Sequence, residues 1–253
     1  MSRNIGGIVD RIANRVARLP LGSRFDIRLD QPIVSFSFDD APLSAATLGA
    51  PILERHGARG TYYLAGRFFD DVEAEPPFMD GKAAQDLASR GHELACHTFA
   101  HRRLRDYSGA ALRDDLADNE QILAGLDGGG GKRSFAIPYT MAWPPATLAM
   151  RSRYTTIRGG RAGINGTGTD FTNLKSVELR ELPGFLEAAE YWLERQAEER
   201  GWLIFFTHHV ADATVPFSIT PEALERLVER TQKMGFAIRT VAEAYAESTG
   251  TPA

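Results

Sequence analysis

The sequence predicts an α/β protein folded as a closed or nearly closed (β/α) barrel of about seven parallel strands. Strand-like apolar runs alternate with helical patterns from residue 33 to the C-terminal end. The runs are mostly apolar, as expected of strands that are buried on both faces, and the alternation repeats seven times. With 253 residues and a hydrophobic content of 43%, the chain can bury one full core.

Each predicted strand is a short run rich in β-branched and aromatic residues. The first ends in Phe38 and is followed by two aspartates, and the sixth is a continuous apolar run. The seven strands are predicted over residues 33–38, 60–65, 92–96, 134–137, 154–157, 202–207 and 236–238.

The predicted helices lie between these strands and carry end signals. Ser108 and Thr220 stand where an N-cap is expected, and a proline follows Thr220 at the first helical position. Gly91 and Gly235 stand where helices would end, and Pro51 predicts a break or kink. The helices are predicted over residues 43–56, 82–90, 108–126, 183–199 and 221–234, and from 241 onward. The segments 67–81 and 158–173 are predicted to be long loops.

Composition excludes several classes of function. The net charge is −4 and no long run of one sign occurs, so nucleic acid is not an expected partner. Cys96 is the one cysteine, so no intrachain disulfide can form, and a cytoplasmic location is expected. No apolar run approaches the roughly 20 residues of a membrane span, and the N-terminus lacks the pattern of a signal peptide.

We divide the chain into an N-terminal extension, residues 1–29, and one globular domain, residues 30–253. Residues 1–21 predict an amphipathic helix. Such a helix could pack across the domain, which we favour, or lie on an anionic membrane surface as a peripheral contact. Its apolar face would consist of Ile5, Ile8, Ile12, Val16 and Leu19.

Reactive residues follow four of the predicted strands. Asp39 and Asp40 follow the first strand, His97 the third, Tyr139 the fourth and His208 the sixth. The C-terminal ends of barrel strands meet at one rim, so we expect these residues to share one site. Taken singly, an aspartate pair can cap a helix and a histidine can be a satisfied core residue. Their joint placement favours a functional site.

Two of the histidines are spaced to hold a metal ion. His97 and His101 are four residues apart, which on a helical turn would place both imidazoles on one face. Two imidazoles and one carboxylate leave a position open for water, which suits hydrolysis. Zinc is the expected metal, and cobalt, nickel and manganese also fit. A non-haem iron triad uses the same ligands, but oxygen chemistry would require neither a second carboxylate beside them nor His208 opposite.

Three motifs resemble those of the polysaccharide deacetylases, the family that includes the NodB chitooligosaccharide deacetylases and is carbohydrate esterase family 4. The motifs are Phe38-Asp39-Asp40, His97-Thr98-Phe99-Ala100-His101 and an apolar strand that ends in His208. Their order and spacing also agree, and the resemblance covers about residues 30–245.

The resemblance implies a distorted (β/α) barrel and makes residues 30–253 the catalytic domain. It implies a divalent metal held by Asp40, His97 and His101. It further implies that Asp39 is the general base and His208 the general acid, and that the backbone N–H of Tyr139 helps to stabilise the oxyanion.

The chain also departs from the family pattern. Ala136 stands where the third motif has an arginine that orients the catalytic aspartate, and Arg158 and Arg161 are the candidate replacements. The acidic fourth motif has no clear match, with Asp170 the nearest acidic residue, and His209 stands where the fifth motif usually has aspartate. These departures indicate a divergent member, whose substrate need not be chitin or peptidoglycan.

The expected activity is metal-dependent hydrolysis of the N-acetyl group of an amino sugar, in a glycan or glycan precursor, with release of acetate. A cytoplasmic enzyme would act on a precursor of a surface glycan or glycolipid. The alternatives are a catalytically weak relative that binds carbohydrate, and a deacylase or deformylase that acts on a different amide.

Overall fold

The computed structural model describes residues 12–16, 22–27, 29–69, 71 and 74–251. Seven strands follow the order β5-β4-β3-β2-β1-β7-β6, β10 pairs with β1 outside this path, and every pairing in the sheet is parallel. The predicted barrel of about seven parallel strands is therefore confirmed. The strands are β1 (Ile33–Asp39), β2 (Thr61–Leu64), β3 (Glu93–Cys96), β4 (Ser134–Ala136), β5 (Thr156–Arg158), β6 (Val177–Glu178), β7 (Trp202–Thr207) and β10 (Ala237–Ile238).

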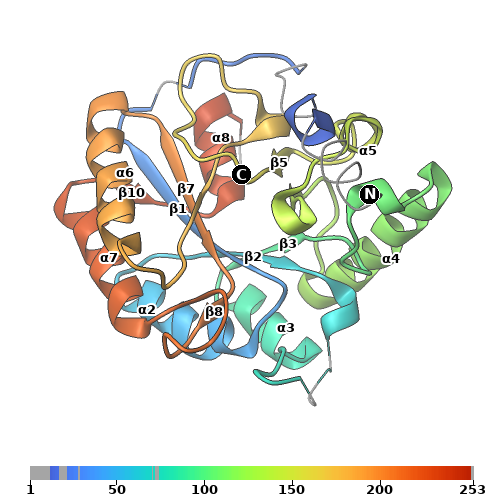
Figure 1. Ribbon diagram of the computed structural model, residues 1–253, viewed down its shortest axis with the longest axis horizontal. Helices are drawn as coiled ribbons and strands as arrows, with labels where there is room; N and C mark the ends of the chain where they lie inside the picture. Colours follow the sequence, from blue (N-terminus) through green and yellow to red (C-terminus); the bar gives the residue numbers. More distant parts are fainter. Residues whose placement is uncertain (1–11, 17–21, 28, 70, 72–73, 252–253) are drawn as a thin grey trace, which may run out of the picture.

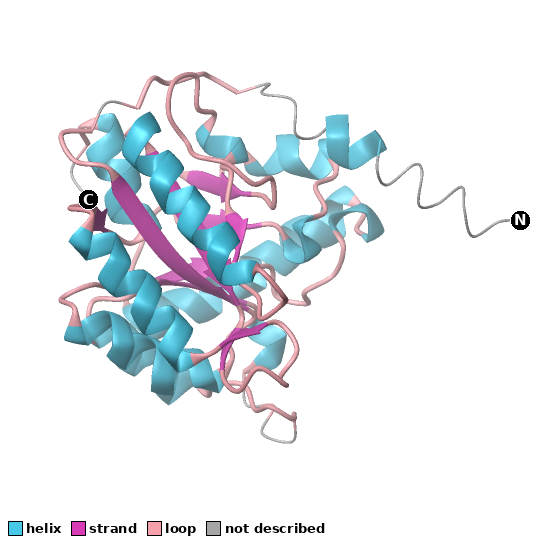
Figure 2. Ribbon diagram, turned by 60° about the vertical axis from the view of Figure 1, so that its left-hand side comes forward, coloured by secondary structure: helices cyan, strands magenta, loops and turns pink. Residues whose placement is uncertain are grey.

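Helices cover the outside of the sheet. In Figure 1 the helices α6, α7, α2, α3 and α4 form an arc around the central strands, and Figure 2 shows the strands as the inner layer. Ser108 and Thr220 cap α4 and α7 as predicted, each accepting a hydrogen bond from a backbone N–H three residues on. The helices are α2 (Ala50–Arg55), α3 (Gly81–Ser89), α4 (Gly109–Asp127), α5 (Pro144–Met150), α6 (Phe185–Glu199), α7 (Pro221–Lys233) and α8 (Val241–Thr249).

Strand β1 lies at the centre of the sheet and is buried along its whole length. Its successive side chains alternate between two faces. Phe36 and Phe38 pack in the larger hydrophobic cluster, beneath the helices, whereas Ile33 packs in the smaller cluster, which includes Tyr63 and Ala136 of the neighbouring strands. The same alternation turns Asp39 to the Ile33 side, which is the inside of the barrel.

The two edges of the sheet are joined by a short segment before and within β6. Leu174 bridges Arg158 of β5, and Val177 pairs with Phe205 of β7. Residues 174–178 therefore reach both edges, and this irregular joint closes the curled sheet. The joint makes the barrel a distorted one, because a single bridge replaces a full strand there.

Several elements were not predicted. Helix α5, strand β6 and the two-stranded sheet of β8 (His209–Val210) and β9 (Ser218–Ile219) lie in segments expected to be loops or connections. All are short, so they show no clear hydrophobic period. The predicted helix over 43–56 does form, but it contains a π-helical turn, Ala45–Gly49, before α2.

The predicted N-terminal helix falls mostly outside the described residues. Residues 12–16 are helical, and the Oδ1 of Asn14 accepts a hydrogen bond from the N–H of Ala142. Ile12 and Val16 are exposed. Within the described ranges, no helix has both the length and the apolar character needed to cross a membrane. The peripheral membrane contact of residues 1–21 and the cytoplasmic location stay predictions.

Candidate active site

A cavity of about 320 Å³ opens where the carboxyl ends of the strands meet. It brings together six residues that the sequence singled out: Asp39, Asp40, His97, His101, Tyr139 and His208. The expectation that several strand ends share one rim is therefore met. Glu178, Arg180 and Phe217 line the same cavity and were not predicted.

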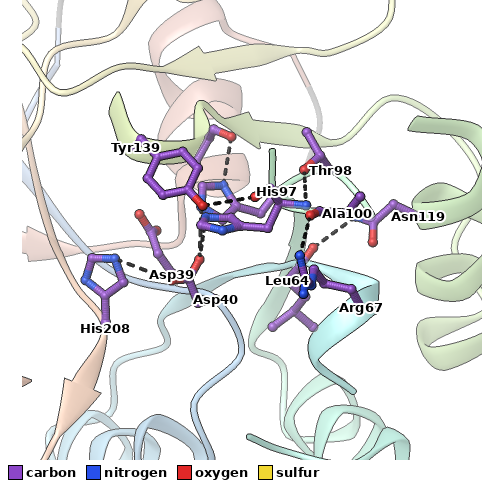
Figure 3. A network of polar contacts seen from close by, with 12 residues as sticks. Asp39, Asp40, Leu64, Arg67, His97, Thr98, Ala100, Asn119, Tyr139 and His208 are labelled. Carbon is purple, nitrogen blue, oxygen red and sulfur yellow. Dashed lines mark hydrogen bonds and ion pairs between the residues drawn. The ribbon is translucent and has the colours of Figure 1, made fainter. Parts of the chain in front are cut away.

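Asp40 lies between the two histidines of the spaced pair. Its Oδ1 is 3.3 Å from the Nε2 of His97 and 3.0 Å from the Nε2 of His101. The backbone of Asp40 has a left-handed φ of 72°, and that of Ala41 a φ of 69°. This turn at the end of β1 directs the Asp40 carboxylate toward the loop after β3, whereas Asp39 stays inside the barrel (Figure 3).

The histidines do not lie on a helical turn, so that part of the prediction was wrong. Residues 97–101 form a loop in which Thr98 has a φ of 65° and His101 a φ of 44°. The N–H of His101 donates to the Oγ1 of Thr98 across this loop. Left-handed residues fold the loop back on itself, which brings the two imidazoles together without a helix.

The tautomer of His97 is fixed by its surroundings. Its Nδ1 lies 2.8 Å from the carbonyl oxygen of Ala136, which can only accept a hydrogen bond. Nδ1 therefore carries the proton, and the lone pair of Nε2 faces Asp40. Histidines that bind metals are commonly oriented in this way.

The three ligand atoms fit a metal ion better than a set of hydrogen bonds. The Oδ1 of Asp40 is buried and has no aligned hydrogen-bond donor among the described residues, although two imidazole nitrogens lie close to it. Ligands about 2.0–2.1 Å from one ion lie roughly 3 Å apart, and the observed separations agree. Two imidazoles and one carboxylate are a donor set that suits zinc and related ions.

The charges of the three groups are strongly coupled. Burial raises the pKa of Asp40, but the neighbouring imidazoles of His101 and His97 outweigh burial and hold that pKa well below its usual value. Burial lowers the pKa of His97, yet contact with Asp40 and the charge of Asp39 raise it above the usual value. Burial and the charge of His97 lower the pKa of His101 against the pull of Asp40. Metal binding would displace a proton from this cluster.

Asp39 is held by Arg158, one of the two predicted replacements. The Nη2 of Arg158 lies 2.5 and 2.6 Å from the two carboxylate oxygens of Asp39. Its guanidinium is sandwiched between the rings of Tyr63 and Phe206. Ala136 is the register partner of Arg158 in the β4–β5 pairing. The arginine missing at Ala136 is thus supplied from the adjacent position on the next strand.

Arg161, the other predicted replacement, is exposed and does not line the cavity. Asp170 is also away from the cavity. It is buried and accepts hydrogen bonds from the N–H and the hydroxyl of Thr172. Of the two candidate arginines, Arg158 is therefore the one that contacts Asp39.

His208 and Tyr139 both lie near the two aspartates, with His208 to their left and Tyr139 above them in Figure 3. The Nε2 of His208 is 3.8 Å from the Oδ2 of Asp40, and its Nδ1 is buried with no hydrogen-bond partner among the described residues. Tyr139 has a φ of 57°, and its hydroxyl donates to the carbonyl of His101.

Helix α4 supports the metal-binding loop through a residue that the sequence did not reveal. The buried carboxylate of Asp115 accepts hydrogen bonds from the N–H groups of Phe99 and Ala100, at 2.8 and 2.9 Å, and from the hydroxyl of Tyr107. One turn on, the Oδ1 of Asn119 accepts a hydrogen bond from the N–H of Gly66, and its Nδ2 donates to the carbonyl of Leu64 at the end of β2. Two polar residues four apart on an otherwise apolar helix face were the available signal.

Replacing Asp115 by Ala is expected to destabilise the fold by about 2 kcal/mol or more, because the substitution leaves donors without an acceptor. It is also expected to weaken metal binding by about 10- to 100-fold, since the loop that carries His97 and His101 loses its support. Urea unfolding and metal titration would measure the two effects. Asp115→Asn keeps one acceptor oxygen, so its losses of stability and of metal affinity should be smaller. The control is Asp118→Ala, an exposed position on the same helix. Unchanged metal affinity in Asp115→Ala would contradict this role.

A second cluster of potential ligands lies away from the cavity. His56, Glu225 and Glu229 are close enough together to hold an ion. However, Glu225 already pairs with Arg55 and His56, and Glu229 with Lys233. These ion pairs explain the cluster without a metal, so one metal per chain is expected.

Comparison with known proteins agrees with the motifs. The family model described as polysaccharide deacetylase matches residues 26–154, just over half of the chain. A chitooligosaccharide deacetylase from Azorhizobium caulinodans is 31% identical over 129 residues, which are 51% of this chain and 57% of that protein. The chain thus matches little more than half the length of this curated relative.

Two solved structures share the fold. The Xyl-CE4 domain of a multidomain xylanase from the hindgut metagenome of Trinervitermes trinervoides has a TM-score of 0.64 at 19% identity, covering 88% of this chain and 93% of that one. A CE4 family pseudoenzyme from Bacillus anthracis has a TM-score of 0.57 at 15% identity, covering 87% and 67%. On the family-model match, the chain belongs to the polysaccharide deacetylase family.

Proposed function

We propose that this protein is a metal-dependent hydrolase that removes the N-acetyl group from an amino sugar, in a glycan or glycan precursor, and releases acetate. The observation that supports this most strongly is the Asp39–Arg158 pair beside the Asp40, His97 and His101 cluster, in one cavity. The arrangement supplies separate groups for binding a metal and for moving protons.

Asp40, His97 and His101 would hold a divalent ion, with zinc the expected metal and cobalt, nickel or manganese the alternatives. When bound, such an ion lowers the pKa of water and polarises the substrate carbonyl. The Ala136 carbonyl fixes the tautomer of His97, so that its Nε2 lone pair is available to the metal.

Asp39 would act as the general base that takes a proton from the attacking water. Its carboxylate is not free to rotate, because Arg158 contacts both oxygens. Arg158 acts through Asp39 and is therefore a positioning residue. The buried ion pair keeps the base aimed into the cavity.

His208 would donate a proton to the departing amine. It lines the same cavity as Tyr139, whose backbone N–H would stabilise the oxyanion. The left-handed backbone of Tyr139 places this peptide at the cavity wall. No role of this kind is proposed for Arg161, because it lies outside the cavity lining.

A carbohydrate-binding protein with weak or no catalysis is the second candidate. A pseudoenzyme exists among the structural neighbours, and the Nδ1 of His208 has no orienting partner in the described part of the chain. The absence of an arginine at Ala136 would also favour this candidate, but Arg158 takes the place of that arginine. Hydrolysis of a different amide, such as a formyl group, would use the same groups.

The purified protein is expected to contain about one metal ion per chain and to release acetate from N-acetylated sugars until a chelator removes the metal. Elemental analysis and an acetate assay on a panel of such sugars would measure this, with restoration by added zinc, cobalt, nickel or manganese. Asp40→Asn should lose the metal, whereas Glu225→Gln, in the second ligand cluster, should keep it. Metal without acetate release from any sugar would favour the binding protein or another acyl group. No metal would contradict the proposal.

A further inference from the structure

Strand β6 and the extended residues directly after it place two charged side chains in the cavity beside the proposed catalytic groups. Side chains two apart on a strand share a face, and both Glu178 and Arg180 line the cavity, whereas Leu179 between them is buried in the core. The N–H of Leu179 donates to the carbonyl of Phe206, which continues the β6–β7 pairing and fixes this orientation.

Arg180 is half-buried and has no acidic partner. No hydrogen bond or ion pair joins its guanidinium to another residue in the ranges that the structure describes, and no carboxylate there lies within 4.0 Å. Arg133 and Arg153, by contrast, each bind a carboxylate through two N–H groups. A half-buried guanidinium with free donors is suited to a ligand that supplies the missing acceptors.

Phe217 holds the Arg180 guanidinium in place. The centre of the guanidinium lies 4.1 Å from the centroid of the Phe217 ring, and the ring of His208 lies 5.3 Å from the same ring. Stacking on an aromatic face fixes the plane of an arginine and leaves its N–H groups at the edge free to bind. One aromatic ring therefore separates the free donors from the proposed general acid.

The backbone of Phe217 is strained in a way that presents this ring. Its φ is 58°, which is an outlier for a bulky side chain. The ring is 45% exposed, while the carbonyl oxygen accepts hydrogen bonds from the N–H groups of His208 and His209. Strain of this kind persists where the surroundings enforce it, and it concentrates at ligand sites.

Glu178 determines which side of the cavity suits an anion. Its exposed carboxylate would repel a negative group and accept hydrogen bonds from sugar hydroxyls. An anionic group would therefore lie on the Arg180 and Phe217 side. The cavity volume of about 320 Å³ is at the lower end for small-molecule sites, so it suits a single sugar residue.

We propose that the preferred substrate is an N-acetylated sugar that carries a carboxylate or phosphate substituent, and that Arg180, stacked on Phe217, binds that substituent. The proposal rests on the proposed deacetylase function and specifies its substrate class. It assigns Arg180 a role in specificity, separate from the proton transfers of Asp39 and His208.

The test compares kcat/KM for acetate release from three probes: N-acetylglucosamine, its 6-phosphate and its 3-O-lactyl ether. These probes share the N-acetylglucosamine unit and differ in the presence, position and kind of an anionic substituent. The unsubstituted protein is expected to favour at least one anionic sugar over the neutral one by about tenfold or more, as expected for a charge-assisted hydrogen bond. In Arg180→Gln this ratio should fall about tenfold, mainly through KM, and Arg180→Lys should retain part of it. Exposed Arg226→Gln is the matched control and should keep the ratio.

Equal kcat/KM for all three sugars, or a preference that persists in Arg180→Gln, would overturn the proposal. If no sugar releases acetate, equilibrium binding of the same probes tests the role of Arg180. Because binding does not require turnover, this measurement can support or refute that role even if the deacetylase function is wrong. Tighter binding of an anionic sugar that depends on Arg180 would support the proposal. Binding without that preference, or no binding, would overturn it.

Discussion

Replacing Asp39 by Asn is expected to lower kcat for acetate release by about 10²- to 10⁴-fold, the usual contribution of a general base. The amide has almost the size of the carboxylate, so the cavity should keep its shape, but it cannot take a proton from water. The metal should stay bound, because Asp40, His97 and His101 are unchanged. Steady-state kinetics with elemental analysis of the same preparation would show both results.

The control for this substitution is Asp212→Asn, the same chemical change between β8 and β9. Asp212 is exposed and does not line the cavity, and its carboxylate accepts hydrogen bonds from the N–H and the hydroxyl of Thr214. It should change kcat by no more than about twofold, since exposed substitutions have small effects. Circular dichroism would verify that Asp39→Asn is folded. Turnover by folded, metal-loaded Asp39→Asn at the wild-type rate would show that Asp39 is not the base.

Replacing Arg158 by Ala is expected to destabilise the fold by about 3–5 kcal/mol, because it leaves Asp39 as an uncompensated buried charge. Arg158 is 1% exposed and Asp39 4% exposed, so water cannot take the place of the guanidinium without rearrangement. The same substitution should lower kcat by about 10²-fold or more, since the base is no longer held in position. Urea unfolding and steady-state kinetics would measure the two losses.

Two further variants test whether Arg158 acts through Asp39. Removing both charges, in Asp39→Ala with Arg158→Ala, should cost less stability than the sum of the single changes. Moving the guanidinium to the neighbouring strand, in Ala136→Arg with Arg158→Ala, roughly conserves volume and should recover part of the lost kcat. Additive stability losses, or wild-type kcat in Arg158→Ala, would refute the pairing.

Much of this fold could be predicted from the sequence because its longer strands have a clear composition. Strands β1 and β7 are buried on both faces, and each appears as a short run rich in β-branched and aromatic residues. Helices α4 and α7 begin at Ser108 and Thr220, whose side chains stabilise the first turn. The same residues mark the start of each helix in the sequence. Strand β6 has two residues and α5 has seven, too few to show a period.

The meeting of Asp39, Asp40, His97 and His208 was predictable because parallel strands end at one rim. The geometry within the rim was not. Left-handed backbone at Thr98 is set by tertiary contacts, and spacing alone suggested a helix. Such contacts lie far apart in sequence and leave little local signal.

The partner of Asp39 could be narrowed to two arginines but not decided. The predicted fifth strand ended one residue before Arg158, whereas β5 includes it, and one residue determines whether a side chain faces the barrel interior. Arg161 lies beyond the strand and is exposed. Register between strands depends on how the whole sheet closes, which no single segment encodes.

The central place of β1 also affects how the chain folds during synthesis and which fragments of it can fold. Its neighbours are β2, which follows soon after it, and β7 and β10, which belong to the last part of the chain. On the ribosome, one edge of β1, with its backbone N–H and C=O groups, therefore stays unpaired until most of the chain has emerged. During that period chaperones would need to cover it. A fragment cut to residues 26–154 would lack both late strands and expose the same edge. Such a fragment should aggregate, although it contains the full ligand set of the metal site.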